Sequence, residues 1–395
     1  MQKLKIFNDP IYGFIPIQSI LIFDIIEHPY FQRLRRISQM GLSYLVYPGV
    51  HHTRFEHALG CLYLMQQAIN ILTSKNVEIS EAEKQALQIA ILLHDIGHGP
   101  FSHTLEHSFV KGVHHESISL QFMEALNDEF DGKLSLAIEI FKGDYKRPFC
   151  NQLISSQLDI DRLDYLKRDS FFSGVTEGNI NSHRLITMLD VVDDNLVIDK
   201  KGIYSVEKFI VARRLMYWMV YLHKTSLAAE CILVNILKRA FELAKIKKNI
   251  AVSEYLNFFL NEPRVFDANT LVVFSKLDDY DIISSVKSWM QHPDPVLSSL
   301  SQSLINRNLP KVIVQNEAFS KEQLESFYKG CSREKDAAYF VHTGTVENLA
   351  YNKDIHPINI KIKEGKIDNI ITVSDHLNLE TLTRPVVKHF AYFPK

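Results

Sequence analysis

The sequence is poor in cysteine and has little excess charge of either sign. Its 395 residues contain four widely scattered cysteines, Cys61, Cys150, Cys231 and Cys331. None of them belongs to a C-x-x-C pair, which argues against a zinc knuckle or a dithiol redox motif. Such sparse use is typical of reduced thiols, and we predict a cytoplasmic location. The net charge of −2 with histidine neutral provides no overall basic field, so a nucleic-acid partner is not favoured.

Long hydrophobic runs, internal repeats and low-complexity segments are also missing. No apolar segment precedes Asp9-Pro10, so we expect no secretory signal. The apolar run over 209–222 is interrupted by Arg213 and Arg214 and is too short to cross a bilayer. Hydrophobic residues nevertheless make up 46% of the chain, enough for a substantial core. We therefore expect a globular protein with no membrane partner.

The hydrophobic periodicity predicts a mainly α protein. Helices are expected over 19–40 with a break at Pro29, and over 54–73, 80–94, 115–143, 150–170, about 205–247 and parts of 252–306. Ser80 and Glu83 fit a capping box at the start of one of these helices. Residues 188–206 change character and predict a small β-hairpin or meander. Strand-like runs at 311–315, 337–342, 357–363 and 368–373 surround a predicted helix near 320–330.

The composition shifts near residue 310, but no Gly/Ser-rich linker marks a boundary. We predict a catalytic core over 1–250, a helical extension over 251–310 and a smaller α+β C-terminal lobe over 311–395. Without a linker, the last lobe is expected to pack tightly against the rest.

Three segments far apart in the sequence concentrate histidine and aspartate: 51–57, 94–103 and 159–169. In one such segment alone, satisfied structural polar groups would be the better interpretation. In all three together, a metal site is the better one, with His57, His94, Asp95 and Asp161 as ligands. Two imidazoles and two carboxylates balance a divalent ion and favour a transition metal over Mg. We expect Mn, Fe, Ni, Co or Zn, and Mg on the substrate phosphates is compatible with this site.

Further polar residues follow the proposed ligands. His98 and His103 lie beyond the helix break marked by Gly97, Gly99 and Pro100, where they could bind phosphate or donate protons. Glu106 follows His103 by three residues and could orient its imidazole if the segment is helical. Arg54 precedes His57 by one helical turn, and a guanidinium there matches phosphate oxygens.

These motifs resemble the HD-domain superfamily of metal-dependent phosphohydrolases. Residues 31–35, 54–57 and 94–103 are most similar to the branch that contains the SAM- and HD-domain dNTP triphosphohydrolase of vertebrates and its bacterial relatives. The similarity runs from about Asn8 to about Lys224 and continues more faintly to the C-terminus. It implies an HD-domain helical core with a small β-hairpin, and metal-dependent hydrolysis of dNTPs to deoxynucleoside and tripolyphosphate.

The resemblance also implies roles for individual residues. His103 would transfer a proton, while His98 and His115 would contact substrate phosphate. A carboxylate is expected where Glu106 stands, although the vertebrate enzyme has Asp there. The implied substrate-binding residues are Arg54, Arg162, Tyr165, Asp169, Arg213, Tyr221 and Gln39. Arg162 replaces a Lys, and Leu222 replaces a polar Gln beside the base, so the preferred base is left open. Relatives assemble as dimers or tetramers, and we expect a homo-oligomer with a nucleotide substrate.

Three functions remain open at this level. The first is dNTP triphosphohydrolysis. The second is another HD phosphohydrolase activity, on nucleoside monophosphates, cyclic nucleotides or another phosphoester. The third is a non-catalytic nucleotide or nucleic-acid binding protein. The cationic side chains of Arg54, Arg162 and Arg213 favour a triphosphate, and the intact ligand positions argue against the third.

Overall fold

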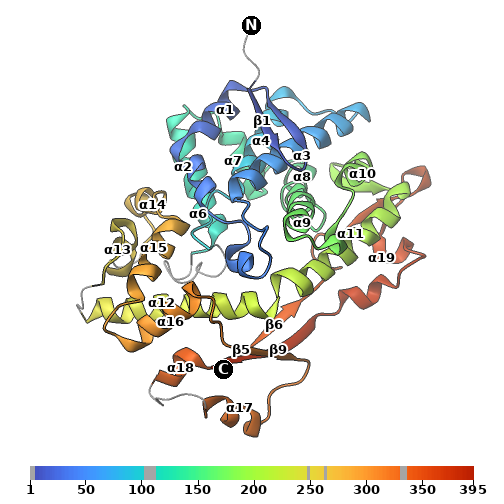
Figure 1. Ribbon diagram of the computed structural model, residues 1–395. Coiled ribbons are helices and arrows are strands. Elements are labelled where there is room, and N and C mark those ends of the chain that lie inside the picture. The colour runs from blue at the N-terminus through green and yellow to red at the C-terminus, as the bar shows by residue number, and fades with distance from the viewer. Residues whose placement is uncertain (1–4, 102–112, 247–249, 262–264, 330–335) are drawn as a thin grey trace.

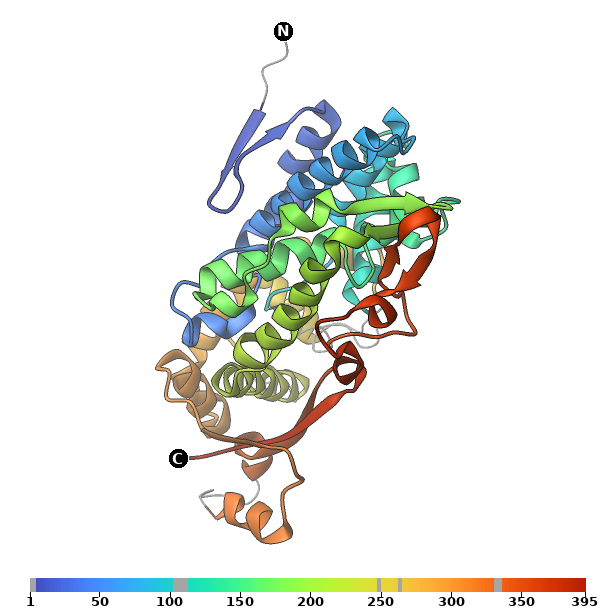
Figure 2. The ribbon, with the colours of Figure 1, turned by 90° about the vertical axis from the view of Figure 1, so that its right-hand side faces the viewer.

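The computed structural model describes residues 5–101, 113–246, 250–261, 265–329 and 336–395. These residues form a mainly α fold, as predicted, and contain three small sheets (Figure 1). It opens with an antiparallel hairpin of β1 (Lys5–Asp9) and β2 (Gly13–Ile17), in which Asp9 lies opposite Gly13. Figure 2 shows this hairpin at the opposite end of the molecule from the C-terminus. Helices α1 (Ile20–Glu27) and α2 (Pro29–Gln32) follow, and Pro29 separates them as expected.

The central helix of the core is α3 (Arg54–Ser74), which packs against both α4 (Glu81–Leu93) and α9 (Ile160–Ser173). Capping boxes start α3 at Thr53 and Glu56 and α4 at Ser80 and Glu83, and the box at Ser80 confirms the prediction. Because α3 has neighbours on two sides, most of its side chains are buried. The remaining core helices are α6 (His115–Glu129), α7 (Ser135–Lys142), α8 (Pro148–Gln152) and α10 (Ser182–Thr187).

Three predicted helices are divided in the structure. The helix expected over 115–143 is α6 and α7, with a turn over 130–134 between them. The helix expected over 150–170 is α8 followed by a non-helical link, and α9 begins only after Asp159, whose side chain accepts from the Arg162 N–H. Pro148 starts α8 because a proline at the first helical position removes no hydrogen bond. The helix expected over 205–247 consists of α11 (Ile203–Met216), a π-helical turn over Tyr217–Tyr221 and α12 (Lys224–Lys245). His223 caps α12 by accepting from the Thr225 N–H, which fixes the break.

The predicted hairpin is confirmed as β3 (Leu189–Val192) and β4 (Asn195–Asp199). Its turn residues Asp193 and Asp194 have φ of 49° and 55°, which suits a tight hairpin turn. Strand β4 also pairs in parallel with β7 (Asn359–Lys361), which pairs with β8 (Ile367–Asn369). The C-terminal chain therefore returns to the sheet of the core.

The third sheet places β9 (Val386–Phe393) between β5 (Lys311–Gln315) and β6 (His342–Asn348), beneath α12 (Figure 1). The sequence did not predict β9. The run at 337–342 is mainly a short helix before β6, and the run at 368–373 is β8 followed by α19 (Ile370–Val373). The other helices are α13 (Glu254–Asn261), α14 (Ala268–Phe274), α15 (Asp279–Trp289), α16 (Pro295–Ile305) and α17 (Lys321–Tyr328).

One hydrophobic core contains buried residues from Ile15 to Leu379, and a small second cluster joins Phe327, Val341 and Ala391. The division into 1–250, 251–310 and 311–395 stays a prediction. Among the helices that the structure describes, none combines the length and the apolar character needed to cross a membrane.

Candidate metal and phosphate site

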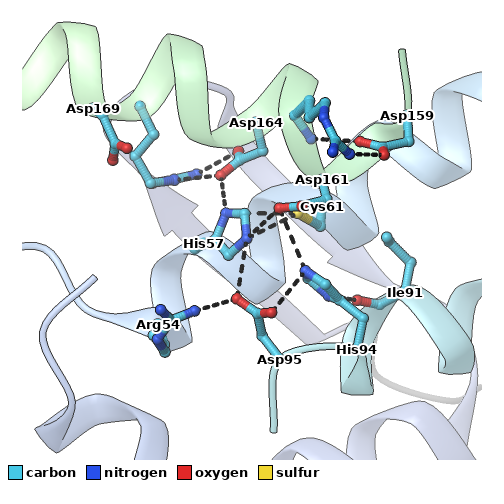
Figure 3. Close-up of polar contacts among 12 residues, drawn as sticks. Arg54, His57, Cys61, Ile91, His94, Asp95, Asp159, Asp161, Asp164 and Asp169 are labelled. Atoms are coloured by element: carbon cyan, nitrogen blue, oxygen red, sulfur yellow. Dashed lines mark hydrogen bonds and ion pairs between the residues drawn. The ribbon is translucent and has the colours of Figure 1, made fainter. Parts of the chain in front are cut away.

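The four predicted metal ligands lie together where α3, α4 and α9 meet (Figure 3). His57 comes from the first turns of α3, His94 caps the end of α4 with Asp95 directly after it, and Asp161 lies in the first turn of α9. His57 Nε2 is 3.1 Å from Asp161 Oδ1 and 3.7 Å from Asp95 Oδ2. His94 Nε2 is 3.5 Å from Asp161 Oδ1 and 3.4 Å from Asp95 Oδ1. Two nitrogens and two carboxylates thus face one point.

The far side of each imidazole is held by an acceptor. His57 Nδ1 is 2.8 Å from Asp164 Oδ2, and His94 Nδ1 is 2.6 Å from the Ile91 carbonyl oxygen. A carbonyl can only accept, so His94 Nδ1 carries the proton and Nε2 presents a lone pair. That buried Nε2 has no hydrogen-bond partner within the described structure and faces carboxylate oxygens. The His94 Nε2 lone pair and the neighbouring carboxylate oxygens are all electron donors directed at one another, an arrangement that a bound cation would stabilise. These residues therefore fit a divalent metal ion.

The electrostatics of the cluster favour positive charge. Burial opposes ionisation of Asp161, yet the nearby imidazoles of His57 and His94 lower its pKa below the usual range. Burial also opposes the charge of His57, but the nearby Cys61 sulfur and hydrogen bonds with Asp161 and Asp164 raise its pKa. The carboxylates therefore remain anionic, and the pocket attracts either a proton or a metal ion.

Cys61 is a neighbour that sequence reasoning missed. It follows His57 by one helical turn, and its Sγ lies 3.6 Å from Nδ1 and 3.7 Å from Nε2 of His57. Together with His57, His94 and Asp161 it forms a group of side chains that could hold a metal. Burial raises the pKa of the Cys61 thiol, which therefore stays protonated and is the weakest donor of the group. Its i, i+4 spacing from His57 was the available signal.

A second group lies beside the first. Asp95, His98 and His115 place one ligand atom each within 4.8 Å of one another. The His98 and His115 rings stack with centroids 4.0 Å apart, and His98 Nε2 is 3.4 Å from Asp95 Oδ1. Burial, and then the charge of Arg54, lower the pKa of His98, so this ring favours the neutral form. His103 and Glu106 lie in 102–112, outside the described residues.

Of the three predicted phosphate-binding arginines, Arg54 and Arg162 already contact carboxylates, and Arg213 contacts a backbone carbonyl. Arg54 Nη1 donates to Asp95 Oδ2, and Arg162 Nη1 donates to Asp159 Oδ2. Arg213 Nη1 donates to the Ala350 carbonyl oxygen at 3.4 Å. The buried Nε–H groups of Arg162 and Arg213 have no partner in the part of the chain that is described. Burial, and then the nearby Tyr217, raise the pKa of Tyr165, while the positive charges of Arg213 and Arg162 lower it.

Aromatic side chains continue the site from α9 to the π-helical turn. The rings of Tyr165 and Tyr221 are 6.2 Å apart, and those of Tyr217 and Tyr221 are 5.2 Å apart. Tyr221 Oη donates to Asp169 Oδ2 at 2.8 Å. The structure therefore joins Tyr165, Asp169 and Tyr221 in one cluster.

His52, like Cys61, is a site residue that the sequence analysis did not predict. Its Nε2 lies 2.8 Å from Asp169 Oδ1, and its ring stacks on Phe172 at 4.4 Å. Its position within 51–57 was the only signal. The predicted site residue Gln39 is adjacent, because its backbone N–H donates to the His52 carbonyl oxygen. The Gln39 Oε1 atom is buried without a hydrogen-bond partner among the described residues and is a ready acceptor.

Comparison with known proteins agrees with this geometry. Residues 54–169 match the HD domain, and residues 180–256 match the HD associated region. A solved phosphohydrolase from Bacteroides thetaiotaomicron is 50% identical, the match covers 100% of both chains, and the TM-score is 0.96. The uncharacterized protein YwfO of Bacillus subtilis is 30% identical over 100% of this chain and 93% of its own.

A more distant match names a substrate. The deoxynucleoside triphosphate triphosphohydrolase SAMHD1 of Homo sapiens is 30% identical over 290 residues, which is 62% of this chain and 46% of the human protein. The ligand geometry, the two matching regions and the full-length relatives agree. This chain belongs to the HD phosphohydrolase superfamily.

Proposed function

We propose that this protein hydrolyses deoxynucleoside triphosphates to deoxynucleoside and tripolyphosphate, with a divalent transition metal held by His57, His94, Asp95 and Asp161. The observation that carries the proposal is the pair of imidazoles whose Nε2 atoms face two carboxylates while their Nδ1 atoms are held from behind. When bound there, such an ion supplies a water of lowered pKa and offsets phosphate charge. The match with SAMHD1 supports the substrate class.

The phosphate chain would lie between the metal ligands and the arginines. Arg162 and Arg213 each keep a buried Nε–H without a partner in the described structure, and a buried donor of this kind costs free energy until it meets an acceptor. Phosphate oxygens are suitable acceptors for a guanidinium. Arg54 would hold Asp95 and neutralise charge near it. His98 and His115 would contact the phosphates from the opposite side of Asp95.

The deoxynucleoside would occupy the aromatic cluster. Tyr165 packed against the sugar C2′ would leave no room for a 2′-hydroxyl, which gives a preference for deoxynucleotides. Asp169 would accept from the 3′-hydroxyl, and it is well fixed for this because His52 and Tyr221 hold its two oxygens. Gln39 and Tyr221 would contact the base and the sugar. His103, oriented by Glu106, would donate a proton to the leaving oxygen.

The alternative within the family is hydrolysis of a monophosphate, a cyclic nucleotide or another phosphoester. The experiment is a screen of purified protein against all dNTPs, NTPs, nucleoside monophosphates and cyclic nucleotides with Mn, Fe, Co, Ni, Zn and Mg. Tripolyphosphate release from dNTPs is the expected result, and Asp161→Ala is the inactive control. Orthophosphate release from monophosphates, with no turnover of any dNTP, would contradict the proposal.

We also propose a homo-oligomer, a dimer or tetramer, in the cytoplasm. Gel filtration with and without mixed dNTPs tests the assembly, and a persistent monomer under both conditions would remove this part of the proposal.

A further inference from the structure

Behind the metal-facing histidine runs a buried chain of charged contacts that ends in the N-terminal hairpin. Its outer member is Asp9, a buried residue at the end of β1. Asp9 Oδ1 accepts from the backbone N–H groups of Ile11 and Tyr12, each at 2.9 Å, and so holds the turn between β1 and β2. Its other oxygen, Oδ2, accepts from Arg168 Nη1 at 2.8 Å. One oxygen of the Asp9 carboxylate therefore holds the hairpin turn, and the other binds Arg168 of α9.

Arg168 is fully buried on α9 and connects Asp9 with a second carboxylate. Its Nε donates to Asp164 Oδ2 at 2.8 Å, and its Nη2 donates to Asp164 Oδ1 at 3.0 Å. This two-point contact fixes the plane of the Asp164 carboxylate. The same Oδ2 atom then accepts from His57 Nδ1 at 2.8 Å. Every member of the chain is buried, so no solvent competes for these contacts.

The charges of the chain are suited to a metal ligand. Two carboxylates and one guanidinium leave one net negative charge directed at His57. Both oxygens of Asp164 accept hydrogen bonds from Arg168, which is the geometry of an ionised carboxylate paired with a guanidinium. Asp164 therefore accepts as a carboxylate, which keeps the His57 proton on Nδ1 and the lone pair on Nε2.

We infer that Asp9 and Arg168 are positioning residues for His57. Through them, the turn of the N-terminal hairpin affects how tightly the site binds its metal. The inference rests on the proposed role of His57 as a ligand. Without the contact from Arg168, the Asp164 carboxylate would be free to rotate. The His57 ring would then no longer be held with its Nε2 lone pair directed at the metal position. Arg168, Asp164 and His57 lie between Asp9 and the metal site. A substitution at Asp9 should therefore lower the metal affinity.

Asp9→Asn is the sharpest test, because it changes one atom of the chain. The amide oxygen can still accept from Ile11 and Tyr12 and keep the turn, whereas the NH2 group can only donate and cannot accept from Arg168. Metal affinity is measured directly by titration of metal-free protein with Co²⁺, with no nucleotide present. The visible spectrum of bound Co²⁺ reports the arrangement of its ligands.

Asp294→Asn is the matched control. Asp294 is also a buried acid that holds a helix start, by accepting from the Leu297 N–H, and that pairs with an arginine, Arg239. The pair joins α12 to α16 and is not part of the chain behind His57. Its loss should lower stability and leave the Co²⁺ affinity and spectrum unchanged.

We expect Asp164→Asn to weaken Co²⁺ binding by about 10- to 100-fold. Asp9→Asn should weaken it by about tenfold, at the lower end of that range, and both variants should alter the Co²⁺ spectrum. Arg168→Lys, which keeps the charge but loses the two-point contact, should give a similar loss, and it decides the matter if Asp9→Asn does not fold. Wild-type affinity and spectrum in folded Asp9→Asn or Arg168→Lys would overturn the inference, even if Asp164→Asn loses metal. Wild-type affinity in His57→Ala would refute the ligand assignment itself, and the inference with it. Turnover of dNTPs enters none of these measurements.

Discussion

Replacement of Gly60 by alanine should destabilise the protein, although alanine is the better helix former. Gly60 lies in the middle of α3, where Gly→Ala ordinarily stabilises a helix by about 1 kcal/mol. A Cβ at this position would lie 2.1 Å from Asp164 Oδ1 and 2.3 Å from Arg168 Nη2. Ordinary contact begins at 3.4 Å, so the ion pair would have to move by about 1.3 Å, the difference between 3.4 and 2.1 Å.

This movement affects two buried charges and a metal ligand. Disruption of a buried ion pair costs about 3–5 kcal/mol when a partner is lost, and displacement costs a large part of that. After subtraction of the gain in helix propensity, we expect Gly60→Ala to lower the free energy of unfolding by about 2–4 kcal/mol. The hydrogen bond from His57 to Asp164 would be lost as well, so metal affinity should fall by about 10- to 100-fold.

Urea unfolding of metal-free protein, followed by circular dichroism, measures the first effect, and Co²⁺ titration measures the second. Asn70→Ala on the exposed face of the same helix is the control, and it should be neutral or slightly stabilising. If Gly60→Ala were as stable as the wild type and bound Co²⁺ equally well, the close packing of α3 against the Asp164–Arg168 pair would not constrain the site as we describe.

Three further predictions concern the metal, the phosphates and a partly buried acid. Chelation should abolish turnover, and added Mn²⁺ or Fe²⁺ should restore it in the wild type but not in Asp161→Ala; restoration in the variant would refute the ligand assignment. Arg213→Gln should raise KM for dNTPs by about 10- to 100-fold through a lost charged hydrogen bond, and an unchanged KM would exclude phosphate contact. Burial raises the pKa of Glu230 to about 7, so its charging weakens the fold as the pH rises from about 4.5 to 7. Because Glu230 is only partly buried, Glu230→Gln should stabilise the protein by about 1–3 kcal/mol at pH 8 and by less at pH 5, and an equal effect at both values would contradict the shift.

Much of the site could be read from residue types and local periodicity. The capping box at Ser80 marks where α4 begins, and its apolar residues continue to Leu93, so His94 and Asp95 emerge at its end. The His57 and Asp161 segments carried the same ligand chemistry. Other features were hidden. The π-helical turn that presents Tyr221 looked like continuous helix, because Tyr217–Tyr221 is apolar or aromatic at every position and an extra residue in the turn leaves no visible break in the pattern.

The sequence by itself determined the helical class of the fold, the principal helices and the three segments that bear the candidate metal-binding side chains, because these depend on contacts a few residues apart. Only the tertiary structure decided which groups stand behind those side chains. Asp164 meets His57 across 107 positions, and Arg168 meets Asp9 across 159. It also decided that β7 joins β4 in parallel, about 160 residues later in the chain. Such pairings are chosen by the packing of whole helices and sheets, and periodicity within one segment contains no record of its distant partner.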